Sequence, residues 1–171
     1  AHCNIPDMKL MQENPEELAK LLRDSSFYTC VYYAGRFAYE AQRYEEAIAT
    51  LQRMNSEHAK ANALPKEIIF ANEYIYQIYI EQKDTVNAVE FIKGCINQFP
   101  NEPWFMQNLI NLYINSGQED KAIEYLDIAI SREPNVGQYY NSKGSILARI
   151  GRFEESFKAF EQAIAIEPNN A

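Results

Sequence analysis

Apolar residues recur at helical spacing along most of this chain, in segments that come in pairs. One such pair lies between residues 103 and 136. Its first segment carries Trp104, Phe105, Leu109, Leu112 and Tyr113, and its second carries Ala122, Ile123, Leu126, Ala129 and Ile130. Gly117, a residue type that often ends helices, lies between the two segments. The pattern predicts two amphipathic helices joined by a tight turn.

A Pro-Asn dipeptide marks the end of this unit and recurs along the chain. Pro100, Pro134 and Pro168 are each followed by Asn, and 34 residues separate one from the next. The residue before a proline is pushed out of helical geometry, so each dipeptide marks the end of a helix. Asn135 is then placed to cap the helix that follows. A fixed period of this length predicts two-helix repeats that stack on their neighbours.

Aligned on this period, the repeats carry the same kinds of residue at equivalent positions. They fall at 69–102, 103–136 and 137–170, and an earlier unit lies at about 28–61. In chain order, the shared positions hold Gly35, Tyr44, Ala47 and Leu51; Ile75, Tyr79, Ala88, Ile92, Cys95 and Pro100; Leu109, Tyr113, Gly117, Ala122, Leu126, Ala129 and Pro134; and Tyr140, Gly144, Leu147, Phe153, Phe160, Ala163 and Pro168. This pattern resembles the tetratricopeptide repeat (TPR) family.

The resemblance implies an all-α fold, an alpha-alpha superhelix in which antiparallel helix hairpins form a TPR solenoid of about four repeats plus a short N-terminal helix. We expect an N-terminal tail and capping helix at 1–25, with the helix starting near Asn14, and a TPR array at 26–171. Small residues such as Gly144 and Ala122 let the two helices of a hairpin approach closely, whereas large apolar side chains fill the gaps between hairpins.

The chain departs from the family pattern at several positions. Tyr76 and Ile110 stand where Gly is usual, and Ser156 stands where Ala is usual. The first repeat is also offset from the second by 41 residues, seven more than the period, and the excess lies near 55–65. We interpret this insert as an extended helix end or an extra turn. A loop with a binding role is the alternative.

The C-terminal edge of the predicted array has no following repeat in this sequence. Leu147, Phe157 and Phe160 are candidates for an apolar side on which nothing packs. A solenoid normally ends in a repeat with a polar outer face. We therefore expect either that these 171 residues are a fragment of a longer array or that this edge pairs with another chain.

Charge and composition exclude two classes of partner. The formal net charge is −8 and the isoelectric point is about 4.9, which argues against a nucleic acid and against an anionic membrane surface. No stretch of 18 apolar, uncharged residues occurs, so we expect no membrane span. The chain starts at Ala1 without Met, which implies an upstream segment removed by biology or by cloning. We expect a soluble protein, cytoplasmic or, if that segment was a secretion signal, periplasmic.

Residues that would carry out chemistry are missing. His2 and His58 are far apart and lack the spacing of metal ligands, and no phosphate-binding glycine loop or nucleophile elbow occurs. The three cysteines include no C-x-x-C motif, and we interpret Cys30 and Cys95 as small buried hydrophobes. We therefore expect no enzymatic activity, no catalytic residue, no cofactor and no metal site.

The resemblance implies a binding surface instead, because in this family the first helix of each repeat lines a concave groove. The candidate groove residues are Tyr32, Tyr33, Arg36, Tyr39, Glu73, Tyr74, Gln77, Gln107, Asn108, Asn111, Asn115, Asn141, Ser142, Ser145 and Arg149. Along the chain, these residues change from mostly tyrosines in the first repeat to mostly amides in the later repeats. Amides can pair with any peptide backbone, and tyrosines offer rigid contact area. The alternative is that these are merely solvated polar helix faces.

One subset of the family binds acidic peptide ends with a clamp of basic residues on the same faces. The matching positions here hold Tyr32, Glu73, Trp104 and Gln107, so we expect that clamp to be absent. The sequence predicts a non-catalytic protein–protein interaction scaffold that binds a peptide or protein in its groove. The alternative is a structural segment of a larger assembly, which docks or self-associates through its C-terminal edge.

Overall fold

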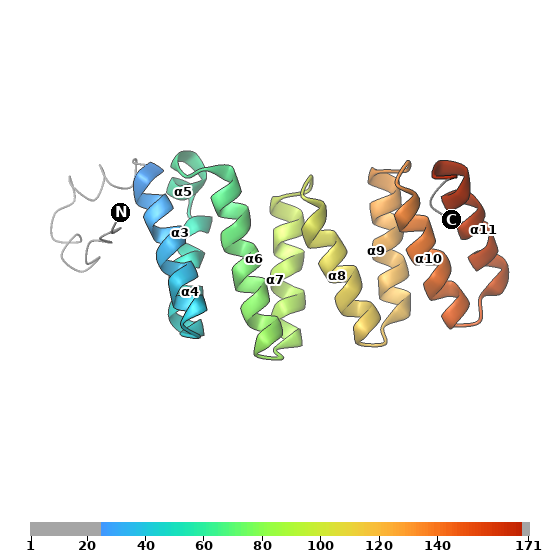
Figure 1. Cartoon of the computed structure of the whole chain (residues 1–171), viewed down its shortest axis with the longest axis horizontal. Coiled ribbons are helices and arrows are strands. Elements are labelled where there is room, and N and C mark those ends of the chain that lie inside the picture. Colours follow the sequence, from blue (N-terminus) through green and yellow to red (C-terminus); the bar gives the residue numbers. More distant parts are fainter. Residues whose placement is uncertain (1–24, 169–171) are drawn as a thin grey trace. The chain divides into compact units, whose positions relative to one another are not determined.

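The computed structural model describes residues 25–168, and in that range it consists of helices and their connections (Figure 1). The elements in chain order are α3 (Ser25–Glu40), α4 (Tyr44–Leu51), the 3-10 helix η1 (Gln52–Asn55), α5 (Glu57–Asn62), α6 (Pro65–Glu81), α7 (Thr85–Gln98), α8 (Pro103–Asn115), α9 (Glu119–Arg132), α10 (Gly137–Arg149) and α11 (Phe153–Ile166). The capping helix predicted near Asn14 lies outside the described residues.

The chain divides into two compact units, Ala1–Ala88 and Val89–Ala171. In the N-terminal unit, α3 and α4 form a hairpin and α6 packs against both helices. In the C-terminal unit, α8 pairs with α9 and α10 pairs with α11, while α10 also packs on α9. Within each unit, therefore, the first helix of one repeat covers the hairpin before it.

The turns inside the hairpins share one backbone feature. Gln42, Lys83, Gly117 and Gly151 each have a positive φ, of 58°, 58°, 66° and 80°. This left-handed conformation redirects the chain after a helix, and glycine adopts it without the steric cost that a side chain adds. We call these four positions the turn residues. They recur with the offsets of the sequence repeat, so they align the hairpins residue by residue.

The insert between the first two repeats packs against the N-terminal unit. Ser56 caps α5, because its hydroxyl accepts a hydrogen bond from the backbone N–H of Ala59 at 3.1 Å. Met54 in η1 is fully buried. Asn55 exchanges two amide hydrogen bonds, of 2.8 and 2.9 Å, with the buried Asn72 of α6. The extra residues thus form a 3-10 turn and a short helix that are tied to α6 by a paired amide.

Close approach of α10 and α11 depends on a glycine. A Cβ added at Gly144 would lie 2.8 Å from the ring of Phe160. Ser156, on the facing helix, donates a hydrogen bond of 2.8 Å to the Gly144 carbonyl, which satisfies this buried hydroxyl. The predicted role of Gly144 is confirmed, and the serine that replaces the usual alanine serves to join the two helices. Tyr76 and Ile110 are both accommodated as buried residues.

Three local predictions are wrong. Asn135 caps no helix: α10 begins at Gly137, Val136 takes the N-cap position, and no side chain caps it. Leu147 is fully buried within its hairpin, so it is not part of an open apolar side. Cys30 is half-buried and disulfide-bonded rather than a free buried thiol. Cys95, by contrast, is buried as predicted, and burial raises the pKa of its thiol to about 12.

The close approach at Gly144 gives a first prediction. Gly144→Ala is expected to lower the free energy of unfolding by about 1–2 kcal/mol, because the new methyl group overlaps the Phe160 ring. Urea denaturation followed by circular dichroism measures the change.

Gly94→Ala is the matched control, because Gly94 also lies inside a helix but a Cβ there meets nothing within 4 Å. Its higher helix propensity is expected to raise the free energy of unfolding by about 0.5–1 kcal/mol. Effects of the same sign at both glycines would contradict the packing described.

Candidate interaction surfaces

Five tyrosines of the N-terminal unit form a continuous set of ring contacts, which we call the tyrosine cluster. Its members are Tyr32, Tyr33, Tyr39, Tyr44 and Tyr74. Tyr74 of α6 lies between two rings of α3, with centroid distances of 6.3 Å to Tyr32 and 5.1 Å to Tyr39. Tyr33 and Tyr44 extend the cluster by contacts of 5.2 Å to Tyr32 and 6.2 Å to Tyr39. Residues seven apart on α3 lie on one helix face, which explains why one ring of α6 can touch both.

One carboxylate fixes the polar end of the cluster. Glu81 accepts hydrogen bonds from the hydroxyls of Tyr39 at 2.6 Å and Tyr44 at 2.8 Å, and from the amide of Gln77 at 3.3 Å. The hydrogen bond to Glu81, together with burial, raises the pKa of Tyr39 to about 12. The same hydrogen bonds, that of Tyr39 first, lower the pKa of Glu81. The two phenols are therefore held in place as neutral donors.

The predicted groove residues of the N-terminal unit differ in their exposure to solvent and in their contacts. Tyr32 is only 8% exposed, because it packs among other aromatic rings, so it supports the surface rather than presenting it. Tyr33 is exposed, and Arg36 forms an ion pair of 2.8 Å with Glu40. Glu73 is half-buried.

Sequence reasoning missed two members of this surface, Tyr44 and Glu81. Tyr44 lies on a second helix and was assigned to a family position, whereas the groove was assigned to first helices only. Glu81 lies seven residues after Tyr74, on the same face of α6, and that spacing is the signal that could have identified it.

The C-terminal unit carries a cavity of about 240 Å³ with both polar and apolar lining, which we call the amide groove. It is lined by Ile114, Asn141, Ser142, Ser145, Ile146 and Arg149. Four of these residues are the ones predicted for the fourth repeat, and the structure brings them together. The two isoleucines give the cavity apolar contacts among its polar groups. Arg149 is held over the neighbouring hairpin by an ion pair of 3.1 Å with Glu119 of α9.

The predicted residues of α8 are partly occupied by hydrogen bonds within their own helix. Gln107 donates to the side chain of Asn111 at 3.1 Å, and Asn108 donates to the Trp104 carbonyl at 2.8 Å. Asn111 and Asn115 are exposed, whereas Gln107 and Asn108 are half-buried. Of these residues, Asn111 and Asn115 are therefore the most accessible to a partner.

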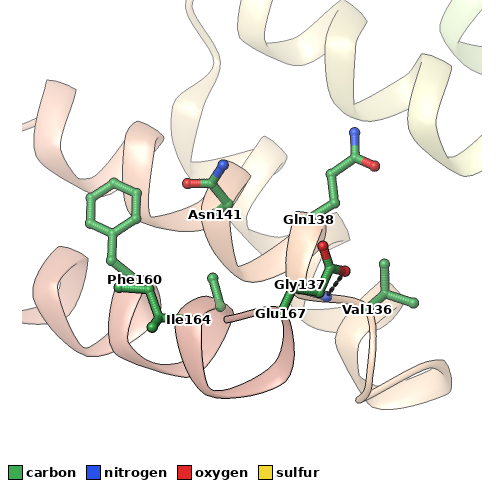
Figure 2. Close-up of a pocket in the computed structure, with 8 residues that line it drawn as sticks. Val136, Gly137, Gln138, Asn141, Phe160, Ile164 and Glu167 are labelled. Atoms are coloured by element: carbon green, nitrogen blue, oxygen red, sulfur yellow. Dashed lines mark hydrogen bonds between the residues drawn. The ribbon is translucent and has the colours of Figure 1, made fainter. Parts of the chain in front are cut away.

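A second cavity of the C-terminal unit, of about 380 Å³, lies where α10 begins and α11 ends, and we call it the end pocket (Figure 2). Figure 2 shows Gln138 and Asn141 of α10 together with Phe160 and Ile164 of α11. Glu167 accepts a hydrogen bond of 3.1 Å from the backbone N–H of Gly137, which links the two ends of this hairpin.

Exposed apolar side chains lie along α11 and in the turn before it. Phe153, Phe157 and Ile164 of α11 are exposed, as is Ile150 in the turn. The prediction that Phe157 lies on an open apolar side is confirmed, and Phe160 is half-buried in the wall of the end pocket. α11 thus presents an apolar face that no described residue covers.

Within residues 25–168, no group of three or more His, Cys, Asp or Glu side chains is arranged to hold a metal ion. None of the helices there is both long and apolar enough to cross a bilayer.

Helix hairpins that pack in series, with polar and aromatic residues on open faces, are typical of helical-repeat proteins that bind other proteins. Family models of the tetratricopeptide repeat match residues 30–61, 79–146 and 137–170. The chain belongs to the tetratricopeptide repeat family, whose members are generally non-catalytic scaffolds for protein interactions, and its fold is an all-α TPR solenoid.

Solved structures with the same fold agree with this assignment. A crystal structure of MamA matches with a TM-score of 0.58 and 18% identity, covering 94% of this chain and 84% of MamA. A structure of MamA AMB-1 matches with a TM-score of 0.56 and 19% identity, covering 86% and 76% of the two chains. YrrB, described as a TPR protein with an unusual peptide-binding site, matches with a TM-score of 0.56 and 16% identity over 95% and 93%. No curated protein sequence matches this chain.

The Glu81 network gives a pH-dependent prediction. Tyrosine in an unfolded chain has a pKa of about 10, and the folded pKa of Tyr39 is raised to about 12. The stabilisation from this hydroxyl is therefore fully present below pH 10 and is lost as the pH rises through about 12. Glu81→Gln is expected to lower the pKa of Tyr39, because a neutral amide favours the neutral phenol less than a carboxylate does.

Titration of the Tyr39 Cζ chemical shift by NMR measures this pKa directly. Glu90→Gln, which removes an exposed carboxylate from α7, is the control and is expected to leave the pKa of Tyr39 unchanged. If the Glu81→Gln variant titrates like the wild type, the hydrogen bond is not the cause of the raised pKa.

Proposed function

We propose that this chain is a scaffold that binds a peptide segment of a partner protein, with the amide groove as the principal contact. The observation that carries the proposal is the convergence of four polar residues of α10 on one cavity with apolar contacts, lined by Asn141, Ser142, Ser145 and Arg149. An extended peptide offers a carbonyl and an N–H at each residue, and amide and hydroxyl side chains can pair with both.

Arg149 gives the amide groove a fixed donor. Its ion pair with Glu119 restricts the guanidinium, while the side chain remains 48% exposed. A guanidinium has five N–H donors, so one carboxylate leaves others available for a carbonyl or carboxylate of the partner. A donor that is already positioned loses less conformational freedom when the partner binds.

The tyrosine cluster supplies a second contact surface on the N-terminal unit. Because Tyr39 and Tyr44 both donate to Glu81, their rings are held in place before any partner arrives. Tyr33 and Phe70 are exposed beside them, and both contact Tyr32. Rigid aromatic side chains contribute contact area at a low cost in conformational entropy. YrrB, which has a similar fold, is described as having a peptide-binding site, and this supports a peptide as the partner proposed for the present chain.

The test begins with selection of binders from a random peptide library on the wild-type chain. The affinity of a selected peptide is then measured by calorimetry for the double variant Ser145→Ala, Arg149→Gln. Loss of a hydroxyl and of a charged donor is expected to weaken binding at least about tenfold, since a hydrogen bond to a charged group contributes about 1.5–3 kcal/mol. The helicity should remain that of the wild type.

The matched control is Ser131→Ala, Arg132→Gln on α9. It changes the same residue types at exposed positions of the same unit. The hydroxyl of Ser131, like that of Ser145, donates a hydrogen bond to a carbonyl of its own helix. Equal affinities in the two double variants would contradict binding in the amide groove. They would instead support the alternative that the polar face of α10 is simply solvated.

A further inference from the structure

The contact between consecutive hairpins follows one register, which the N-terminal unit shows directly. Ile48 of α4 lies six residues after the turn residue Gln42, and Ile78 of α6 lies five residues before the turn residue Lys83. Both belong to one apolar cluster, in which Ile48 packs against the buried Ala38, Ala47 and Ile78. We call these the plus-six and minus-five positions. In this unit, a plus-six side chain packs in the same cluster as the minus-five side chain of the next hairpin.

The C-terminal unit follows the same register. Its plus-six residue in α9 is Ile123, six residues after Gly117, and its minus-five residue in α10 is Ile146, five residues before Gly151. Their exposed fractions are 7% and 4%, and α9 and α10 are in contact. In both units these two positions are therefore buried or half-buried where one hairpin follows another.

At the step from α7 to α8 the register residues are Val89 and Leu112, and both are half-buried. The register residues of α11 and α3 are instead exposed phenylalanines. Phe157 of α11 occupies the plus-six position and is 70% exposed. Phe37 of α3 occupies the minus-five position and is 64% exposed. Both side chains are therefore largely open to solvent, and both are apolar like the isoleucines at the equivalent internal positions.

We propose that a second copy of this chain completes the register, so that α3 of one copy packs on α11 of another, with Phe37 against Phe157. Neither phenylalanine lines the amide groove, so this inference does not depend on peptide binding there. Burying a phenylalanine side chain contributes about 1.5–3 kcal/mol, so two of them make a substantial apolar centre for a contact.

Neighbouring groups on both faces fit this arrangement. Phe153 and Ile164 extend the apolar face of α11 and are 58% and 49% exposed, and Tyr33 extends the face of α3. The charged pair on α3 is Arg36 and Glu40, whose ion pair neutralises both charges before the faces meet. The end pocket beside Ile164 adds a hollow that an aromatic side chain can enter.

This contact joins two different faces, so it is heterologous. Each copy keeps one free α3 and one free α11, and the association continues beyond a dimer unless a ring closes. A contact of α11 with α11 would instead give a closed dimer. The two geometries therefore differ in the sizes of the species formed and in which single variants abolish association.

Sedimentation velocity over a range of protein concentrations tests the proposal. The wild type is expected to form species larger than a dimer as its concentration rises. Phe37→Asp and Phe157→Asp should each weaken association at least about tenfold, because a buried carboxylate replaces the apolar centre. An equimolar mixture of the two variants should form a one-to-one complex and nothing larger, since each variant retains one intact face.

Val86→Asp is the control, because Val86 is an exposed apolar residue outside both faces and its replacement should leave association unchanged. Circular dichroism checks that every variant remains folded. A wild type that stays monomeric at all concentrations overturns the proposal. So does a Phe37→Asp variant that associates like the wild type, which is the behaviour of an α11–α11 dimer.

Discussion

Burial of one hairpin by the first helix of the next is the constraint on which each unit depends. A two-helix repeat has apolar residues outside the contact between its own two helices. It can bury these residues only against a neighbouring repeat. Ile48 and Ile78 show this in the N-terminal unit, and Ile123 and Ile146 in the C-terminal unit. Removal of a neighbour therefore exposes this apolar face to solvent.

Polar contacts follow the same register as the apolar ones. The residue two positions after the turn residue meets the residue two positions before the next turn residue. In the N-terminal unit this pair is Tyr44 with Glu81, at 2.8 Å, and in the C-terminal unit it is Glu119 with Arg149, at 3.1 Å. The chemistry differs but the geometry is conserved between the units. Hairpin packing therefore decides which polar groups reach the candidate binding surfaces.

Features that recur in every repeat could be predicted from the sequence. Contacts that occur at a single place in the chain could not. The hairpins and the close approach at Gly144 follow from recurring small and apolar residues, which leave a periodic signal. The junction of Asn55 with Asn72 has no such signal, because it arises from a single insert. Asn135 failed for a similar reason: its residue type suits a cap, yet the local backbone places Val136 there instead.

The candidate surfaces differ in how far periodicity could reveal them. The polar residues of α10 share one helix face, so helical spacing together with the family resemblance placed Asn141, Ser145 and Arg149 together. The tyrosine cluster needs a ring from a second helix, and only the packing of α3, α4 and α6 brings Tyr44 to Glu81. The exposed phenylalanines are a third case, since neither is unusual in its own helix. Their meaning appears only when the turn residues align the hairpins and show that the equivalent residues inside the units are buried or half-buried.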